Sequence, residues 1–120
     1  MQAPLTPAVF HILLSLSARE MHGYAIMQEV AVQSNGSLSM GPGTLYGSLK
    51  RMLAADLVCE ADERPDPALD DERRRYYKLT DLGLRTLQAE ADRLANLMSQ
   101  EAMQRVLGQT MPQNFSGGIA

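Results

Sequence analysis

Several features that mark other classes of protein are scarce or missing in this sequence of 120 residues. Cys59 is its only cysteine, which excludes an internal disulfide and a metal site built from several cysteines. The sequence contains no run of about eighteen apolar residues, so no transmembrane helix is expected. Its first residues lack the basic and then apolar pattern of a secretory signal. We therefore expect a cytoplasmic protein with no membrane partner.

The residue patterns of a catalytic centre are also missing. No paired carboxylates, nucleophile with a base, or phosphate-binding loop stand at an interpretable spacing, and the segment 41–43 lacks the lysine of a P-loop. The isolated residues His11 and Cys59 are interpreted as packing residues, with metal binding and redox sensing as the minor alternatives. We predict that the protein is not an enzyme and that it has no cofactor and no metal site.

Positive charge is not in excess, because the formal net charge is -3. A negative total does not by itself suggest a nucleic-acid binder, but the charges are unevenly distributed. From Glu60 to Glu72 there are seven acidic residues and one basic residue, and directly afterwards Arg73, Arg74, Arg75 and Lys78 reverse the sign. This pattern predicts a local basic patch beside an acidic loop.

Among the features that are present, the stretch from Gly41 to Leu57 is the most informative. Pro42 restricts φ to a value that suits the first turn of a helix. Apolar residues then recur at helical spacing, and cations, hydroxyls and a glycine lie opposite them. The apolar stripe consists of Leu45, Leu49, Met52, Leu53 and Leu57, and the other side carries Thr44, Gly47, Lys50 and Arg51, with Tyr46 and Ser48 on the flanks. Such a helix packs one side on a core and offers the other to nucleic acid.

The remaining elements follow from similar local signals. Thr6-Pro7 begins a helix that extends through about Ser17, and a second helix covers about 23–33. Two strands, over about 58–61 and 75–79, enclose a segment rich in proline and acidic residues that is typical of a hairpin tip. Thr80-Asp81 then supplies the cap of a last helix, which extends to about residue 107.

The last predicted helix is long, and its apolar residues step by three and four positions, close to a heptad pattern. So long a helix has little of its own domain to pack against, so we expect its apolar seam to meet a second copy of the chain. A helix docked on its own core is the alternative. The first helix is also apolar on two faces, which suggests a partner there as well. The residues predicted at the dimer interface are Phe10, Leu14, Leu87, Ala91, Leu94, Met98 and Ala102.

Three helices, two strands and a long helix follow the order of a winged helix with a dimerisation helix added. The predicted fold class is mainly α with a small β-hairpin. Residues 1–80 would form the winged helix-turn-helix domain, 81–107 the dimerisation helix and 108–120 a flexible tail. The stretch from Gly41 then becomes the recognition helix, which enters the major groove by its N-terminal half. The candidate DNA-binding residues are Tyr24, Ser39, Gly43, Thr44, Tyr46, Lys50, Arg51, Arg73, Arg74 and Arg75.

Three pieces of the sequence stand out, and they are His22-Gly-Tyr-Ala-Ile26, Gly43-Thr-Leu-Tyr46 with Leu49-Lys-Arg51, and Arg74-Arg-Tyr-Tyr-Lys-Leu-Thr80 with Gly83 after it. In this order and at these intervals they resemble the short PadR-type transcriptional regulators over about residues 5–107. The resemblance implies a homodimeric winged-helix repressor that is released from its operator by a small-molecule effector, with no enzymatic activity. We expect a palindromic double-stranded site near its own or a neighbouring promoter.

Carried over by the same resemblance, Tyr24, Thr44, Tyr46 and Lys50 match positions associated with DNA contact. For Tyr24, a half-buried ring with its hydroxyl in water is an equal alternative. Two features depart from the family pattern. The predicted hairpin tip is acidic, so phosphate should repel it, and we do not expect it to touch DNA. Its acidic residues include Asp66, Asp70, Asp71 and Glu72.

The second departure is that the chain has no tryptophan, on which the best-known drug-binding short members stack flat ligands. The effector-binding residues are therefore left unassigned. The alternative function is a winged-helix module that uses the same surface to bind protein, without specific DNA binding. The acidic net charge is the feature that favours this alternative.

Overall fold

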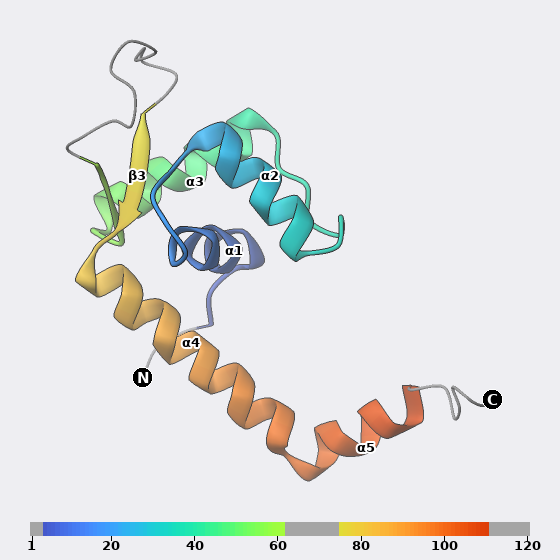
Figure 1. The fold of residues 1–120 in the computed structure, drawn as a ribbon. Helices are drawn as coiled ribbons and strands as arrows, with labels where there is room; N and C mark the ends of the chain where they lie inside the picture. Colours follow the sequence, from blue (N-terminus) through green and yellow to red (C-terminus); the bar gives the residue numbers. More distant parts are fainter. Residues whose placement is uncertain (1–3, 62–74, 111–120) are drawn as a thin grey trace. The chain divides into compact units, whose positions relative to one another are not determined.

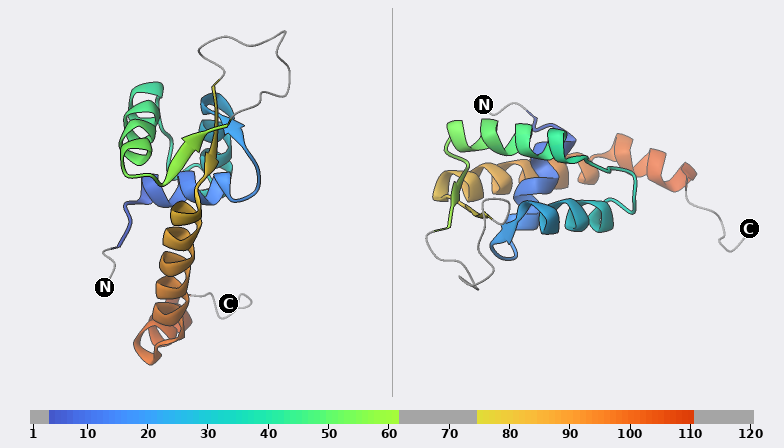
Figure 2. Two further views of the ribbon diagram at one scale, coloured as in Figure 1. Left: turned by 90° about the vertical axis from the view of Figure 1, so that its left-hand side faces the viewer. Right: turned by 90° about the horizontal axis from the view of Figure 1, so that it is seen from above.

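The computed structural model describes residues 4–61 and 75–110. Three helices, α1, α2 and α3, form the N-terminal part of the fold (Figure 1). The Oγ1 atom of Thr6 accepts a hydrogen bond from the Val9 amide at 3.2 Å, and Pro7 follows, so the predicted helix start is confirmed. The helices pack on one another, with α1 running across the other two (Figure 2). Their bounds are α1 Pro7–Leu16, α2 Gly23–Gln33 and α3 Pro42–Ala54.

The hydrophobic core lies among these three helices and the small sheet. All five residues of the predicted stripe pack in this core or against its edge. Four of them lie within α3, where the helix period brings them to one side, and the fifth, Leu57, follows the end of α3 and is half-buried. The fully or nearly buried apolar residues are Ile12, Leu13, Leu16, Met21, Ile26, Val30, Met40, Leu45, Leu49, Met52, Val58, Tyr77 and Leu87.

The sheet has three antiparallel strands in the order β1-β3-β2, where the sequence predicted two. The hairpin pair β2 and β3 is confirmed, and Val58 lies opposite Leu79 in its register. The strand that the sequence did not predict is β1, which consists of only Met21 and His22 and pairs with Tyr77 and Tyr76. Two residues are too few for an alternating pattern to appear in a sequence. The bounds are β1 Met21–His22, β2 Val58–Glu60 and β3 Tyr76–Leu79.

A tight junction fixes the end of α3 to the start of the last helical segment. Asp56 takes the left-handed conformation, with φ of 63°, and ends the helix. The Thr80 hydroxyl donates to the Asp56 carbonyl at 2.6 Å and accepts from the Gly83 amide at 2.9 Å, which confirms the predicted cap. A Cβ at Gly83 would run into the Leu57 carbonyl, so only glycine allows this close approach.

The single long helix predicted for 81–107 is wrong, because the structure has two helices, α4 Asp81–Ser99 and α5 Glu101–Thr110. Local hydrogen bonds end α4. The Ser99 hydroxyl donates to the Asn96 carbonyl at 2.8 Å, and the Gln100 amide donates to the Leu97 carbonyl at 3.2 Å, three residues back. The Gln104 side chain donates to the Met98 carbonyl. These bonds satisfy carbonyls that a continuous helix would use.

The chain divides within α4 into two units, Met1–Ala89 and Glu90–Ala120. Leu87 falls in the first unit, where it is 6% exposed and belongs to the core, so its predicted place at a dimer interface is wrong. In the second unit Ala91, Met98 and Ala102 are exposed and Leu94 is half-buried. Helix α5 continues through the first three residues of the predicted tail, and the rest of that tail lies outside the described residues. Among the described residues, no helix is long and apolar enough to cross a membrane.

Candidate nucleic-acid interface

The side of α3 opposite the core is exposed and polar, as the sequence predicted. Thr44, Lys50 and Arg51 are exposed on it, and Tyr46 is 40% exposed. The Arg51 side chain folds back along its own helix, because its Nη2 atom donates to the Ser48 hydroxyl at 3.3 Å. Lys50 is therefore the cation of α3 that extends from this face without a hydrogen bond to described residues. The arrangement suits contact with a polyanion.

The N-terminus of α3 carries no side-chain cap. Its N-cap residue is Gly41, whereas Thr6, His22 and Thr80 cap the other helices of the first unit through their side chains. The amides of Gly43 and Thr44 donate to no atom of the described residues. Free amides at a helix N-terminus, with the positive end of the helix dipole, bind anions such as phosphate. Ser39, another predicted contact, is exposed just before this turn.

Tyr46 has a packing role in addition to the role predicted for it. Its ring edge and hydroxyl occupy the space that a Cβ at Gly23 would need, so the start of α2 and the first turns of α3 approach closely there. The glycine of the His22-Gly-Tyr motif therefore makes room for the tyrosine of the Gly43-Thr-Leu-Tyr motif. Neither motif alone reveals this contact.

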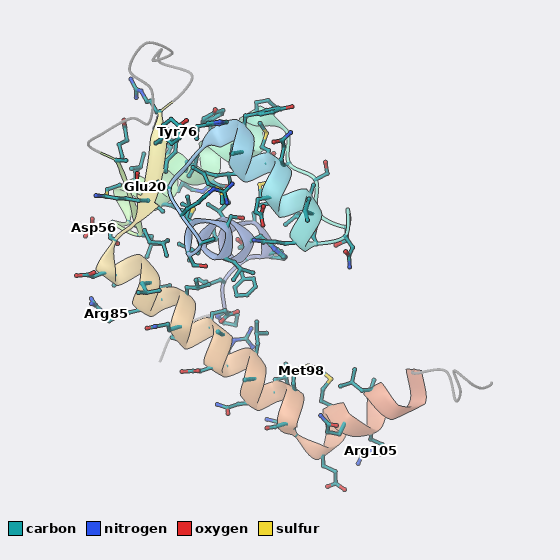
Figure 3. All side chains as sticks on the ribbon, viewed as in Figure 1. Glu20, Asp56, Tyr76, Arg85, Met98 and Arg105 are labelled. Atoms are coloured by element: carbon teal, nitrogen blue, oxygen red, sulfur yellow. The ribbon has the colours of Figure 1, made fainter. Side chains whose placement is uncertain are left out.

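An aromatic cluster of His22, Tyr24 and Tyr76 lies beside that contact. The His22 ring stacks on Tyr24, with centroids 6.5 Å apart, and meets the Tyr76 ring edge-on at 5.3 Å. Tyr76 is labelled in Figure 3. The Nδ1 atom of His22 also accepts a hydrogen bond from the Ala25 amide at 3.2 Å, and so caps α2. Tyr24 is 61% exposed, which leaves its ring open to a ligand. His22 is part of a sequence motif, but no local pattern in the sequence predicts its contact with Tyr76, because the fold sets this contact.

The base of the predicted wing holds a basic and an acidic side chain together. The Nη1 atom of Arg75 lies 3.6 Å from Oε2 of Glu60, where β2 ends and β3 begins. Tyr77, opposite Glu60 in the sheet, is buried, and this burial raises the pKa of its hydroxyl. The charges of Glu60 and Tyr46 raise that pKa further, and Arg75 lowers it. Arg73 and Arg74 lie outside the described residues.

The other residues singled out in the sequence are half-buried. His11 joins a polar network, since its Nδ1 lies 3.0 Å from Oε1 of Gln33, whose Nε2 donates to the buried Ser15 hydroxyl at 3.2 Å. Phe10 and Leu14 are half-buried against the core, and Cys59 is half-buried opposite Lys78. No group of three or more His, Cys, Asp or Glu residues in the described part of the chain is placed to hold a metal.

Two curated relatives share part of this sequence. The chain is 35% identical over 86 residues to an uncharacterized 37.1 kDa protein in transposon TN4556 of Streptomyces fradiae, and this covers 72% of the chain and 22% of that protein. It is 28% identical over 72 residues to uncharacterized protein X of Lysinibacillus sphaericus, which covers 60% of the chain and 63% of that protein. The chain thus spans less than two thirds of either relative.

Solved structures match the fold over most of its length. A PadR family transcription regulator from Clostridium difficile superposes with a TM-score of 0.66 at 23% identity, covering 85% of this chain and 99% of that one. A transcriptional regulator from Clostridium thermocellum gives a TM-score of 0.61 at 17% identity, with 86% and 88% covered. RosR of H. salinarum gives 0.63 at 21% identity, with 88% of each chain covered. These likenesses establish the winged-helix fold.

The family model of the PadR-like transcriptional regulators matches residues 12–89. The matched range contains α2, α3, the three strands and the start of α4, and so includes the exposed face of α3 and the aromatic cluster. It extends over more than half of the chain, and the structural neighbours agree with it. The chain therefore belongs to the PadR-like family of transcriptional regulators, whose members are not enzymes.

Proposed function

We propose that this protein is a homodimeric repressor that binds a palindromic operator at its own or a neighbouring promoter. The exposed face of α3 carries the proposal. Lys50, the Thr44 hydroxyl and the free amides at the helix N-terminus stand together there, and they match the groups of a major-groove reader. Tyr24 and Arg75 extend this surface to the start of α2 and the base of the wing.

Dimerisation through the second unit is part of the proposal. Its helices carry apolar side chains at helical spacing, and these remain uncovered in a single chain. Leu97, Met98 and Val106 are 36%, 44% and 51% exposed. Half-buried Leu94, Met103 and Leu107 lie among them. A two-fold dimer built on this surface would present two copies of α3, one for each half of a palindrome.

Release by a small-molecule effector completes the proposed cycle. This part rests on family resemblance, and no residue of the chain is assigned to the effector. Cytoplasmic location is proposed with it, because an operator-binding repressor acts where the genome is. A screen for compounds that dissociate the protein from its operator is the direct route to an effector.

The alternative is a winged-helix module that binds a protein through the same surface. The net charge of -3 favours it, because a negative chain is repelled by DNA at long range. Only the DNA-binding function predicts salt-dependent binding to DNA. Binding to DNA weakens steeply as salt rises because counterions are released.

One titration distinguishes them. Genomic fragments that the protein retains are selected first, and their binding is then measured at several salt concentrations for the wild type, Lys50→Ala and Arg85→Ala. Lys50→Ala should lose about 1–3 kcal/mol of binding free energy per subunit. Arg85→Ala, which removes an exposed cation from α4, should bind like the wild type. A wild type without salt-dependent binding would favour the protein-binding module, and an unchanged Lys50→Ala would show that α3 does not enter the groove.

A further inference from the structure

The ion pair at the base of the wing has geometry that bears on DNA binding. Glu60 is the last residue of β2 and Arg75 directly precedes β3. Because Glu60 lies opposite Tyr77 in the antiparallel register, Arg75 is its diagonal neighbour on the same face of the sheet. Their charged atoms are 3.6 Å apart, and the two side chains are 42% and 46% exposed. Both partners are therefore open to solvent and to ligands.

This pair is poorly suited to a purely structural role. An exposed single ion pair gains little in water, because both charges stay hydrated and salt screens them. Arg75 therefore leaves Glu60 readily for a stronger anion. An arginine binds phosphate through two parallel hydrogen bonds, which the single contact at 3.6 Å does not provide.

Glu60 ends β2, and this strand is in contact with α3. Burial, and then the charges of Glu60 and Tyr46, raise the pKa of Tyr77, so Glu60 and Tyr46 each lie within electrostatic reach of Tyr77. A DNA backbone that follows α3 to the wing meets Arg75 already paired. Once Arg75 turns to phosphate, the Glu60 carboxylate is left without that partner beside the DNA.

We propose that Glu60 competes with DNA phosphate for Arg75, so that this carboxylate limits the affinity of the protein for DNA. The inference rests on the proposed function, because it requires DNA at this surface. It assigns a role to an acidic residue that the sequence marked only as the first of an acidic run. The competition would lower the affinity for the DNA backbone further in a chain whose net charge of -3 already disfavours DNA binding.

The competition has a signature in the salt dependence of binding. Salt screens the exposed pair between Glu60 and Arg75, so the carboxylate competes with phosphate most strongly at low salt and less as the salt concentration rises. Removing the carboxylate charge should therefore tighten binding and also steepen its dependence on salt.

The experiment measures DNA binding at several salt concentrations for the wild type and for Glu60→Gln. The variant should bind operator DNA about two- to fivefold more tightly per subunit at low salt. The gain should shrink as salt rises, so the slope of log affinity against log salt should be steeper for the variant than for the wild type. Glu101→Gln is the matched control, since Glu101 also makes an exposed ion pair, 3.9 Å from Arg105, and loses the same charge. It should leave affinity and slope unchanged.

A second pair of variants separates competition from plain repulsion. Arg75→Gln should weaken binding, and adding Glu60→Gln to it should change nothing further, because no arginine is left to release. An equal gain in that background would mean that Glu60 only repels phosphate, and the proposal would be overturned. An unchanged Glu60→Gln, or an equal gain in Glu101→Gln, overturns it too. If the wild type shows no salt-dependent binding to any DNA, the proposed function fails and this inference with it.

Discussion

At the scale of single residues, Gly23 shows how a position without a side chain supports a surface. The ring of Tyr46 fills the space beside it, so α3 and the start of α2 are fixed against each other there. Tyr46 remains 40% exposed in this position. Its role is therefore double, because the part of the side chain that does not pack on Gly23 faces outward on α3.

We expect Gly23→Ala to impair DNA binding more than folding. The added methyl would collide with the Tyr46 ring and move it, whereas alanine is itself a better helix residue than glycine. Operator affinity should fall about tenfold, and the free energy of unfolding should change by less than about 1 kcal/mol. DNA titration and chemical denaturation measure the two effects.

Tyr46→Ala provides the test of that mechanism. In a Tyr46→Ala background the methyl at residue 23 meets no ring, so Gly23→Ala should have no further effect on binding. Equal losses in both backgrounds would show that Gly23 acts through some other contact.

At the scale of secondary-structure elements, the helices after the wing differ most from expectation. The apolar periodicity predicted one helix over 81–107, because it continues from α4 into α5 and gives no sign of the break between them. The break at Gln100 comes from side-chain hydrogen bonds to carbonyls, which periodicity does not record. The predicted dimer interface also began too early in the chain, because Leu87 packs in the core of the first unit.

We expect the apolar surface of the second unit to hold two subunits together, so a charge placed there should separate them. Met98→Glu, alone or with Leu97→Glu, would bury a carboxylate in that interface, which costs several kcal/mol. Light scattering after size exclusion should show the mass fall from that of a dimer to that of a monomer. Asn96→Glu adds the same charge at an exposed position of α4 and should remain dimeric. A dimer that survives the double substitution would contradict this assignment of the interface.

At the scale of the whole molecule, the sheet connects the stability of the fold to pH. The pKa of Tyr77 is raised above that of an unfolded tyrosine, first by burial and then by Glu60. A raised pKa means that the tyrosine hydroxyl loses its proton at a higher pH in the native state than in the unfolded state. The stabilisation is complete below about pH 10, the unfolded pKa, and is lost as the pH rises through the native pKa.

The free energy of unfolding should therefore fall above about pH 10, and Tyr77→Phe should make this fall shallower. Denaturant titrations between about pH 8 and 11 measure it. Tyr24→Phe, which removes a hydroxyl from a side chain that is 61% exposed, is the matched control. A fall of equal steepness in Tyr77→Phe and the native protein would show that other groups cause it.

Most of the fold and part of the site could be predicted from the sequence because they depend on neighbours along the chain. The helix caps at Thr6 and Thr80, the stripe of α3 and the hairpin strands are all local patterns. The exposure of Lys50 follows from the same stripe. The roles of His22 and Glu60 do not, since each depends on a residue brought close by the fold.

The sequence by itself determined the first three helices and the hairpin strands, the face of α3 that turns outward and the membership of the PadR-like family. Helical and strand periods act over a few residues, so they can be read without the tertiary structure. Only the tertiary structure decided that β1 joins the sheet, that Leu87 turns inward and that Glu60 holds Arg75. These outcomes depend on contacts between distant residues, whose energies arise only when packing brings the atoms together.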